Sequence, residues 1–376
     1  MTSAAVRVTG VIEASAPGKL FLLGEYAVLH GAPALLTAVD RRARVTVVVP
    51  DAADAANDAG WRFTAPAIGI AECSLQSDGA LPPTLDDDTR ARLRVFDAVR
   101  RVVAKSVASA PPGLTVTVDS AAFWHRDHKL GLGSSAAVAA ALTAALAAAH
   151  GLSLTQEELV RRATDAHRRA QGGTGSGGDV AASCSGGLIT FTREWGAAAG
   201  PRLMPQHWPD DLELRVVATG AGSSSTELVG RVAEYGRRDP RGHAADLDRL
   251  AALAGQAGPA LASADTFLAL AEDYFDALID LDHHAGAGIV TDRHHWLRTL
   301  VAANGGVFKT SGAGGGDVGL VFARAGAGAR RVASALHEAG VETIPLGFGG
   351  PGAQLADSRG RGADDDGDRI DTEGAS

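Results

Sequence analysis

Apolar and polar residues alternate with a period of two in several short segments, a pattern typical of half-buried strands. Residues 6–14 read VRVTGVIEA, and Lys19 opens a short apolar run, KLFLL. Apolar residues recur at helical spacing in other segments, over 89–107, 155–170, 243–304 and 329–339. Further strands are predicted at 44–49, 114–118, 187–192, 212–219, 305–309 and 318–322. This mixture predicts an α+β or α/β fold.

One glycine-rich stretch lies directly before the most strongly helical segment. Residues 129–138 read KLGLGSSAAV, and the alanine-rich run that follows meets no helix breaker before Gly151. The first N–H groups of a helix have no partner inside it and carry partial positive charge, so a phosphate can bind there. Three interpretations remain open: a loop that caps a core helix, a dinucleotide fingerprint, and a triphosphate cradle. The fingerprint requires a preceding strand, and residues 124–129, WHRDHK, do not read as a buried one.

Composition limits the possible functions. The chain has 376 residues, which is typical of two domains, and 45% of them are hydrophobic. A net charge of −9 disfavours a nucleic-acid partner. Two cysteines cannot form a disulfide framework, and no signal peptide or membrane-spanning run is visible, so we expect a cytoplasmic protein that does not contact a membrane. The domains are predicted at 1–205 and 206–355, followed by a disordered acidic tail at 356–376.

Two more glycine loops occur beside residues that could carry chemistry. Residues 172–178, GGTGSGG, precede Asp179, and residues 311–317 read SGAGGGD. Asp179 could simply cap a helix, which aspartate does well. Lys19 could extend its ammonium to solvent or point it into a cleft. The two residues alone leave these alternatives open.

Taken together, three stretches resemble the three motifs of the GHMP kinases, in the family's order. They are APGKLFLLGEYAV, KLGLGSSAAV and KTSGAGGGDVG. Within this superfamily the chain looks most like the phosphomevalonate kinases, because it has Tyr26 where mevalonate kinases usually carry a histidine, and Asp317 and Lys309 at the third motif. It departs from mevalonate kinases in one further way. Their magnesium-binding glutamate has no counterpart in residues 164–171, TDAHRRAQ.

The resemblance implies a fold, a set of ligands and a set of site residues. The fold would be α+β, with an N-terminal α+β domain, a C-terminal ferredoxin-like domain and the active site between them. Lys19 and Asp179 match the family's catalytic pair, and Mg²⁺ would be held by Ser135, with Ser134 as the alternative. ATP would bind at Lys129, Gly131, Leu132, Gly133, Ser134, Ser135 and Ala136. The acceptor substrate would contact Lys19, Glu25, Tyr26, Ser176, Asp179, Lys309, Ser311, Gly312, Ala313 and Gly314.

The implied reaction is phosphorylation of 5-phosphomevalonate by ATP, with small molecules as the partners of a monomer or homodimer. A phosphate acceptor is already mostly a dianion at neutral pH and needs no base, so Asp179 would then hold Lys19 in place. An alcohol acceptor would need a base, and mevalonate kinase is therefore the main alternative. A related decarboxylase and a non-catalytic binding protein are weaker ones, and the presence of both Lys19 and Asp179 argues against the latter.

Overall fold

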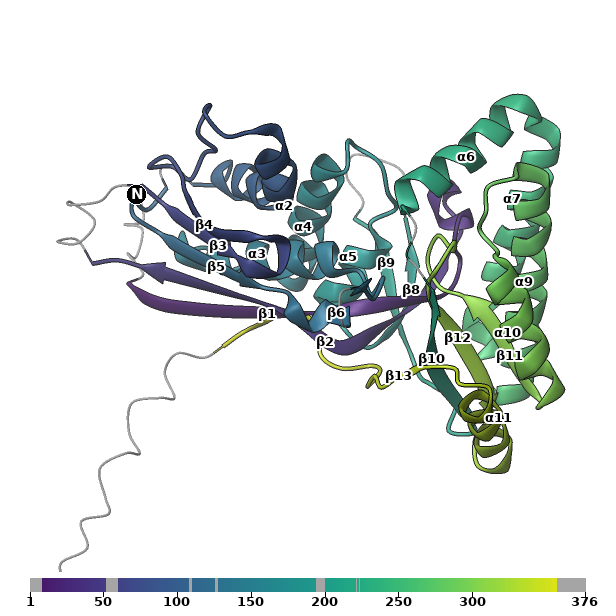
Figure 1. Ribbon diagram of the computed structural model, residues 1–376. Helices are drawn as coiled ribbons and strands as arrows, with labels where there is room; N and C mark the ends of the chain where they lie inside the picture. The colour runs from purple at the N-terminus through teal and green to yellow at the C-terminus, as the bar shows by residue number, and fades with distance from the viewer. Residues whose placement is uncertain are drawn as a thin grey trace, which may run out of the picture.

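The computed structural model describes residues 9–51, 60–107, 110–125, 128–193, 200–220, 222 and 224–356. The start of the first predicted strand and all but the first residue of the tail predicted at 356–376 lie outside these residues. The described chain forms two α+β halves that lie side by side, each built on its own sheet (Figure 1). The expected two-domain α+β organisation is therefore confirmed.

The first half is built on a mixed sheet of eight strands. Its centre is the long antiparallel pair β1 and β2, which extends from Gly10 opposite Val49 to Leu23 opposite Leu35, with register shifts between Pro17 and Lys19 and between Phe21 and Leu23. In the second part of β2, Val45, Val47 and Val49 point to the same face and are buried, while Val48 between them is exposed. The strands are β1 (Gly10–Leu23), β2 (Ala34–Val49), β3 (Arg62–Ala65), β4 (Ile70–Ser74), β5 (Thr115–Asp119), β8 (Leu188–Thr192), β9 (Arg202–Gln206) and β14 (Gln354–Leu355).

Four helices cover one face of this sheet (Figure 1). The alanine-rich helix lies centrally and is buried along most of its length, because alanine lets it approach both the strands and the flanking helices closely. The helices are α2 (Asp87–Ala104), α3 (Ser134–Ala149), α4 (Gln156–Ala170) and α5 (Gly178–Ser185). The short elements of this half are η1 (Ala27–His30), η2 (Pro66–Ile68), η3 (Ala121–Phe123), β6 (Trp124–His125) and β7 (His128–Lys129).

The second half has an antiparallel sheet in the order β11-β12-β10-β13. Numbered along the chain, this is the 4-1-3-2 order of a ferredoxin-like fold, as expected. Its strands are β10 (Leu212–Gly220), β11 (Gly306–Thr310), β12 (Asp317–Arg324) and β13 (Thr343–Ile344). Its helices are α6 (Ser225–Arg238), α7 (Pro240–Ala254), α8 (Ala257–Ala260), α9 (Ala264–Ala285), α10 (Asp292–Ala303) and α11 (Ala327–Glu338).

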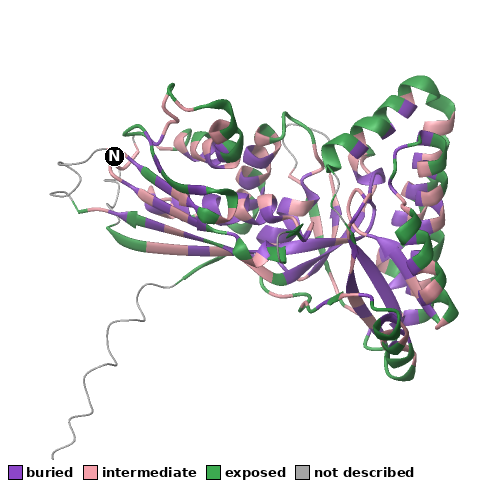
Figure 2. Cartoon of the chain, viewed as in Figure 1, coloured by how far each residue is buried: buried purple, intermediate pink, exposed green. Residues whose placement is uncertain are grey.

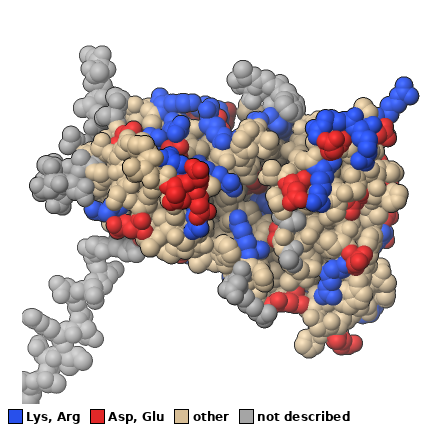
Figure 3. Space-filling view, turned by 45° about the horizontal axis from the view of Figure 1, so that its top comes forward, with Lys and Arg blue, Asp and Glu red and all other residues tan. Residues whose placement is uncertain are grey.

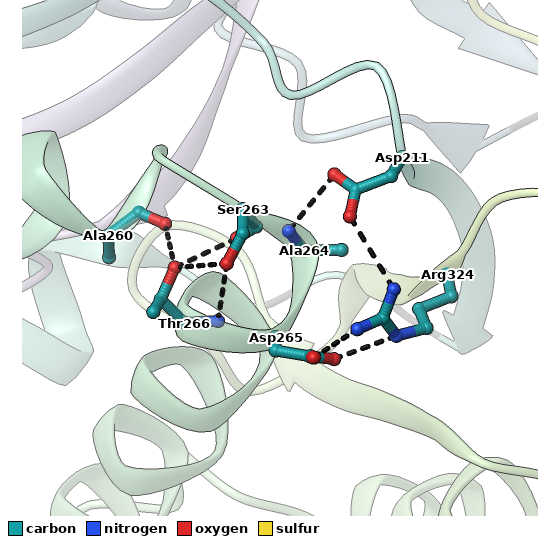
Figure 4. Close-up of polar contacts among 7 residues, drawn as sticks. All are labelled: Asp211, Ala260, Ser263, Ala264, Asp265, Thr266 and Arg324. Carbon is teal, nitrogen blue, oxygen red and sulfur yellow. Dashed lines mark hydrogen bonds and ion pairs between the residues drawn. The ribbon is translucent and has the colours of Figure 1, made fainter.

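A polar cluster attaches the longest helix, α9, to the sheet of the second half (Figure 4). Arg324 ends β12 and pairs with Asp265 in the first turn of α9, at 2.7 Å from Nε to Oδ1. The same guanidinium lies 3.5 Å from Asp211, whose other oxygen accepts the N–H of Ala264 at 3.1 Å. A carboxylate at a helix N-terminus is favourable, so the cluster fixes where α9 begins.

Buried residues form two clusters, one for each half (Figure 2). The cluster of the second half continues into the first, where it includes Leu20 and Leu22 of β1 and Leu132 of the glycine loop. The halves therefore meet through packed apolar side chains beside the first two motifs. Among the described residues, no helix is both long and apolar enough to cross a membrane.

Candidate active site

A cleft of about 670 Å³ opens where the two halves meet, and all three predicted motifs contribute to it. The first half supplies β1, the glycine loop of α3 and the start of α5, and the second half supplies the start of α6 and the loop before β12. The polar and charged side chains that line it are Lys19, Glu25, Tyr26, Arg94, His128, Lys129, Ser134, Ser135, Gln171, Ser176, Asp179, Ser224, Ser225 and Asp317.

Lys19 lies at the centre of this arrangement, and only 7% of it is exposed. A register shift between Pro17 and Lys19 interrupts β1, and the Lys19 N–H donates to the carbonyl of Leu132 at 2.8 Å. The side chain crosses Gly133, where an added Cβ would lie 2.8 Å from the lysine Cε. Burial lowers the pKa of Lys19, while the carboxylates of Asp179 and Asp317 oppose that shift.

The glycine loop has the geometry of an anion site. Gly131 and Gly133 have φ values of 65° and 75°, which favour glycine, and Gly133 occupies the N-cap of α3 without a side chain to cap it. Two more helices begin at the same cleft, α5 beside Asp179 and α6 at Ser225. Three helix N-termini therefore converge here with Lys19. On the face drawn in Figure 3, by contrast, acidic and basic side chains are interspersed over both halves. This convergence favours a polyanionic ligand.

Asp317 faces the glycine loop from the second half. A Cβ added at Gly131 would lie 2.5 Å from the Oδ2 of Asp317, and a Cβ added at Gly222 would lie 2.1 Å from its Oδ1. Only glycine at both positions therefore leaves room for this carboxylate. Burial raises the pKa of Asp317, and the ammonium groups of Lys19 and Lys129 oppose that rise.

Contacts between segments almost 300 residues apart connect the first and third motifs. The Tyr26 hydroxyl donates to the carbonyl of Ala313 at 2.6 Å. Ser311 accepts from the Phe21 N–H at 3.2 Å and donates to the Phe21 carbonyl at 3.0 Å. These bonds fix the third glycine loop against β1 and thereby shape the cleft.

Most of the predicted site residues line the cleft, but five do not. Lys309 is fully buried and pairs with Glu25 at 2.6 Å, and Ser311 bonds to Phe21. Leu132 and Ala136 turn their side chains into the core, and Gly314 packs against Ile289. Leu132 still contributes through its carbonyl, which accepts the N–H of Lys19.

The sequence also left several cleft residues unassigned. Arg94 lies on α2, where the helical pattern indicated only a polar face, and Gln171 ends α4. Just behind Gln171, His167 is 1% exposed and touches Ser135, with 3.0 Å from its Nε2 to the serine Oγ. In the sequence, Asp317 was only a feature typical of phosphomevalonate kinases, and it was not predicted to be a site residue. A basic residue in the last turn of an amphipathic helix gives no sign that it is buried, so the pattern could not find His167.

Comparison with known proteins identifies the family. The family model "GHMP kinases N terminal domain" matches residues 94–187. A phosphomevalonate kinase of Streptomyces sp. (strain CL190) is 34% identical over 88% of this chain and 95% of its own length. The chain belongs to the GHMP kinases. A mevalonate kinase of Pyrococcus abyssi is 28% identical over 88% of this chain and 93% of its own length.

Solved structures of this family have the same fold. The Streptococcus pneumoniae phosphomevalonate kinase in complex with phosphomevalonate and AMPPNP superimposes with a TM-score of 0.71, at 18% identity, over 90% of this chain and 99% of that one. The resemblance read from the three motifs is thus confirmed. Its curated relatives place this GHMP kinase with the kinases that act in the mevalonate series.

Proposed function

We propose that this GHMP kinase transfers the terminal phosphoryl group of ATP to the phosphate of 5-phosphomevalonate, giving 5-diphosphomevalonate and ADP. The observation that carries the proposal is the convergence of three helix N-termini with Lys19 in one cleft. Two polyanions must lie close together in this reaction, and such a cleft offsets their charge. The Streptomyces relative is named for this activity, and the Streptococcus structure contains this substrate.

In the proposed complex, the triphosphate lies on Gly131, Gly133 and the first turn of α3. An oxygen of the acceptor phosphate attacks the terminal phosphorus while the bond to the ADP oxygen breaks. Lys19 offsets the charge on the transferred group, which is the main catalytic requirement of phosphoryl transfer. A phosphate dianion needs no base, so Asp179 serves to hold the ammonium of Lys19 in place and to shape the pocket.

The residues of the cleft also fit a magnesium ion that arrives with the nucleotide. The Ser135 hydroxyl and the Asp179 carboxylate both line the cleft, and oxygen ligands are those that Mg²⁺ prefers. Among the described residues, no group of three or more histidine, cysteine, aspartate or glutamate side chains could hold a metal. Such an ion would therefore take its other ligands from phosphate and water, and would supply neutralisation of the triphosphate charge.

A coupled assay of ADP release with mevalonate, 5-phosphomevalonate and 5-diphosphomevalonate tests the proposal. We expect turnover with 5-phosphomevalonate and much less with the other two. A Lys19→Ala variant measures the background ATPase, and its kcat should fall by at least ~10²-fold, as on loss of a transition-state contact. Equal or better turnover of mevalonate would identify an alcohol acceptor, and release of CO₂ from 5-diphosphomevalonate would identify a decarboxylase.

A further inference from the structure

His167 connects three residues that line the cleft, although it does not line the cleft itself. Its Nε2 lies 3.0 Å from the Oγ of Ser135 on α3 and 3.3 Å from the side-chain nitrogen of Gln171. Its Nδ1 lies 3.7 Å from the Oδ2 of Asp179 on α5. One buried imidazole on α4 therefore touches the phosphate loop and the proposed catalytic aspartate at the same time.

When the imidazole is neutral, the partners of the ring decide which of its nitrogens carries the proton. Asp179 offers only acceptor oxygens, which favours the proton on Nδ1. The amide nitrogen of Gln171 can only donate, which favours a bare Nε2. Both contacts therefore select the same tautomer, in which Nε2 is an acceptor.

This tautomer fixes the hydroxyl proton of Ser135. Because a bare Nε2 can only accept, the Ser135 hydroxyl donates its single proton to His167. The remaining lone pairs of the serine oxygen then face the cleft. An acceptor pointed at a phosphate oxygen is unfavourable, whereas an acceptor pointed at a divalent cation is a ligand.

We propose that His167 is a positioning residue, which turns the Ser135 proton away from the cleft and steadies the Asp179 carboxylate, so that both oxygens face the cleft as ligands for a nucleotide-bound divalent cation. The inference rests on the proposed function for the cation and nucleotide alone, and not on the identity of the acceptor. It also separates the two serines of the loop, because it makes Ser135, and not Ser134, the cation ligand.

Two conservative variants separate the two contacts of the ring. In His167→Gln the side-chain oxygen can take the position of Nε2, which keeps an acceptor for Ser135 but loses the N–H toward Asp179. In His167→Asn the amide nitrogen can take the position of Nδ1, which keeps the N–H but loses the acceptor. His150→Gln is the matched control, since His150 ends α3, bonds to the carbonyl of Leu146 at 2.7 Å and does not line the cleft.

Calorimetry with Mg-ADP and with metal-free ADP gives the first readout. Loss of an outer partner of a metal ligand typically costs about 10–100-fold in metal affinity. We expect His167→Asn and Ser135→Ala to weaken Mg-ADP binding at least tenfold and metal-free ADP binding less than threefold. His167→Gln should weaken Mg-ADP binding less than His167→Asn does, because Ser135 keeps its acceptor, and it should lower kcat at least tenfold. An equal loss for both forms of ADP would show a purely structural role and overturn the proposal.

Nitrogen-15 NMR of the imidazoles in the ligand-free enzyme gives a second, independent readout. The His167 signal, assigned in the parent enzyme through its correlations to the backbone of the same residue, should show the proton on Nδ1. A proton on Nε2 would overturn the proposal, even if the variants failed to fold. The ADP-binding and NMR readouts stand if the acceptor substrate is wrong, because neither contains an acceptor; the ADP-release assay and the kcat comparison would then fail.

Discussion

At the scale of single residues, backbone strain is concentrated at the cleft. Among the described residues, only Tyr26 and Asp317 combine a side chain with a positive φ, both at 60°, and both line the cleft. Such conformations cost on the order of 1–3 kcal/mol each and persist only where the surroundings enforce them. Tyr26 is held by its bond to Ala313, and the carboxylate of Asp317 fits between Gly131 and Gly222, where any added side chain would clash with it. The strained conformations place both side chains at the cleft.

Asp317→Gly should separate stability from activity. Glycine relieves the strained φ but costs roughly 0.5–1 kcal/mol of chain entropy, so the melting temperature should stay unchanged or rise. The value of kcat/KM should fall at least tenfold, about 1.4 kcal/mol, because Lys19 and Lys129 lose a neighbouring carboxylate. Asp317→Asn is the control that keeps the size and tolerates this φ, and it should lose activity alone. A destabilised but fully active Asp317→Gly enzyme would contradict this assignment.

The sequence revealed the residues whose chemistry depends on a local motif. Lys19 and Asp179 adjoin recognisable patterns, and the glycine loop precedes an unbroken helix, so all three could be placed in one cleft through the family resemblance. His167 and Arg94 lie on amphipathic helices, where charged residues usually face solvent. Their approach to the cleft depends on how α2 and α4 pack against α3, and no local pattern contains that information.

At the scale of elements, the sequence predicted the strands that have a clear alternating pattern of apolar residues. It missed the strands whose formation depends on pairing with distant segments. Residues 10–14 of the first predicted segment and the second predicted segment, 19–23, are parts of one strand, β1, interrupted by the register shift that places Lys19. The β3–β4 hairpin lies between the strand predicted at 44–49 and the helix predicted at 89–107, where no element was predicted, and β3 pairs in parallel with β5 some 50 residues later. Pairing over such distances is selected by the sheet and leaves little trace in a short segment.

The N-terminus of α10 contains a titratable group that should limit stability in acid. His294 caps this helix through the Thr291 N–H at 3.1 Å, is fully buried, and has a pKa lowered to about 4, chiefly by burial. Below pH 6.5 the unfolded chain binds a proton here that the folded chain does not. The free energy of unfolding should therefore fall between pH 6.5 and 4, by up to ~3 kcal/mol.

Urea unfolding at several pH values measures this contribution. His294→Gln keeps a side chain that can complete the capping box but removes the titration, so its stability curve should lack that part of the acid slope. His283→Gln on α9 is the control, because His283 is exposed, and it should follow the parent. Parallel curves for the parent and His294→Gln would show that His294 contributes nothing to the acid slope.

At the scale of the whole molecule, the cleft exists because two halves are fixed against one another. The boundary proposed at 205/206 falls within β9, and β14 returns the chain to the first sheet, so the second half begins and ends beside the first. Each half could be anticipated from patterning and the order of the motifs. Their contacts could not, because Glu25–Lys309 and Tyr26–Ala313 join residues more than 280 positions apart.

The Glu25–Lys309 pair should be the most sensitive of these contacts. Both side chains are almost completely buried, Lys309 also donates to the carbonyl of Thr310 at 2.5 Å, and Tyr274 donates to the carbonyl of Glu25 at 2.8 Å. Burial lowers the pKa of Lys309, and Glu25 opposes that shift. Removing one partner leaves a buried charge uncompensated, which typically costs about 3–5 kcal/mol, whereas replacing both with neutral groups is often close to neutral.

Lys309→Met should therefore lower the free energy of unfolding by about 3–5 kcal/mol, and Glu25→Gln with Lys309→Met should recover most of that loss. The matched control is Arg249→Met, which breaks an ion pair with Asp280 whose side chains are about half exposed. That change should cost less than about 1 kcal/mol, because water screens exposed pairs. If Lys309→Met cost no more than Arg249→Met, or if the double variant were as unstable as the single one, the buried pair would not be what holds the two halves at the cleft.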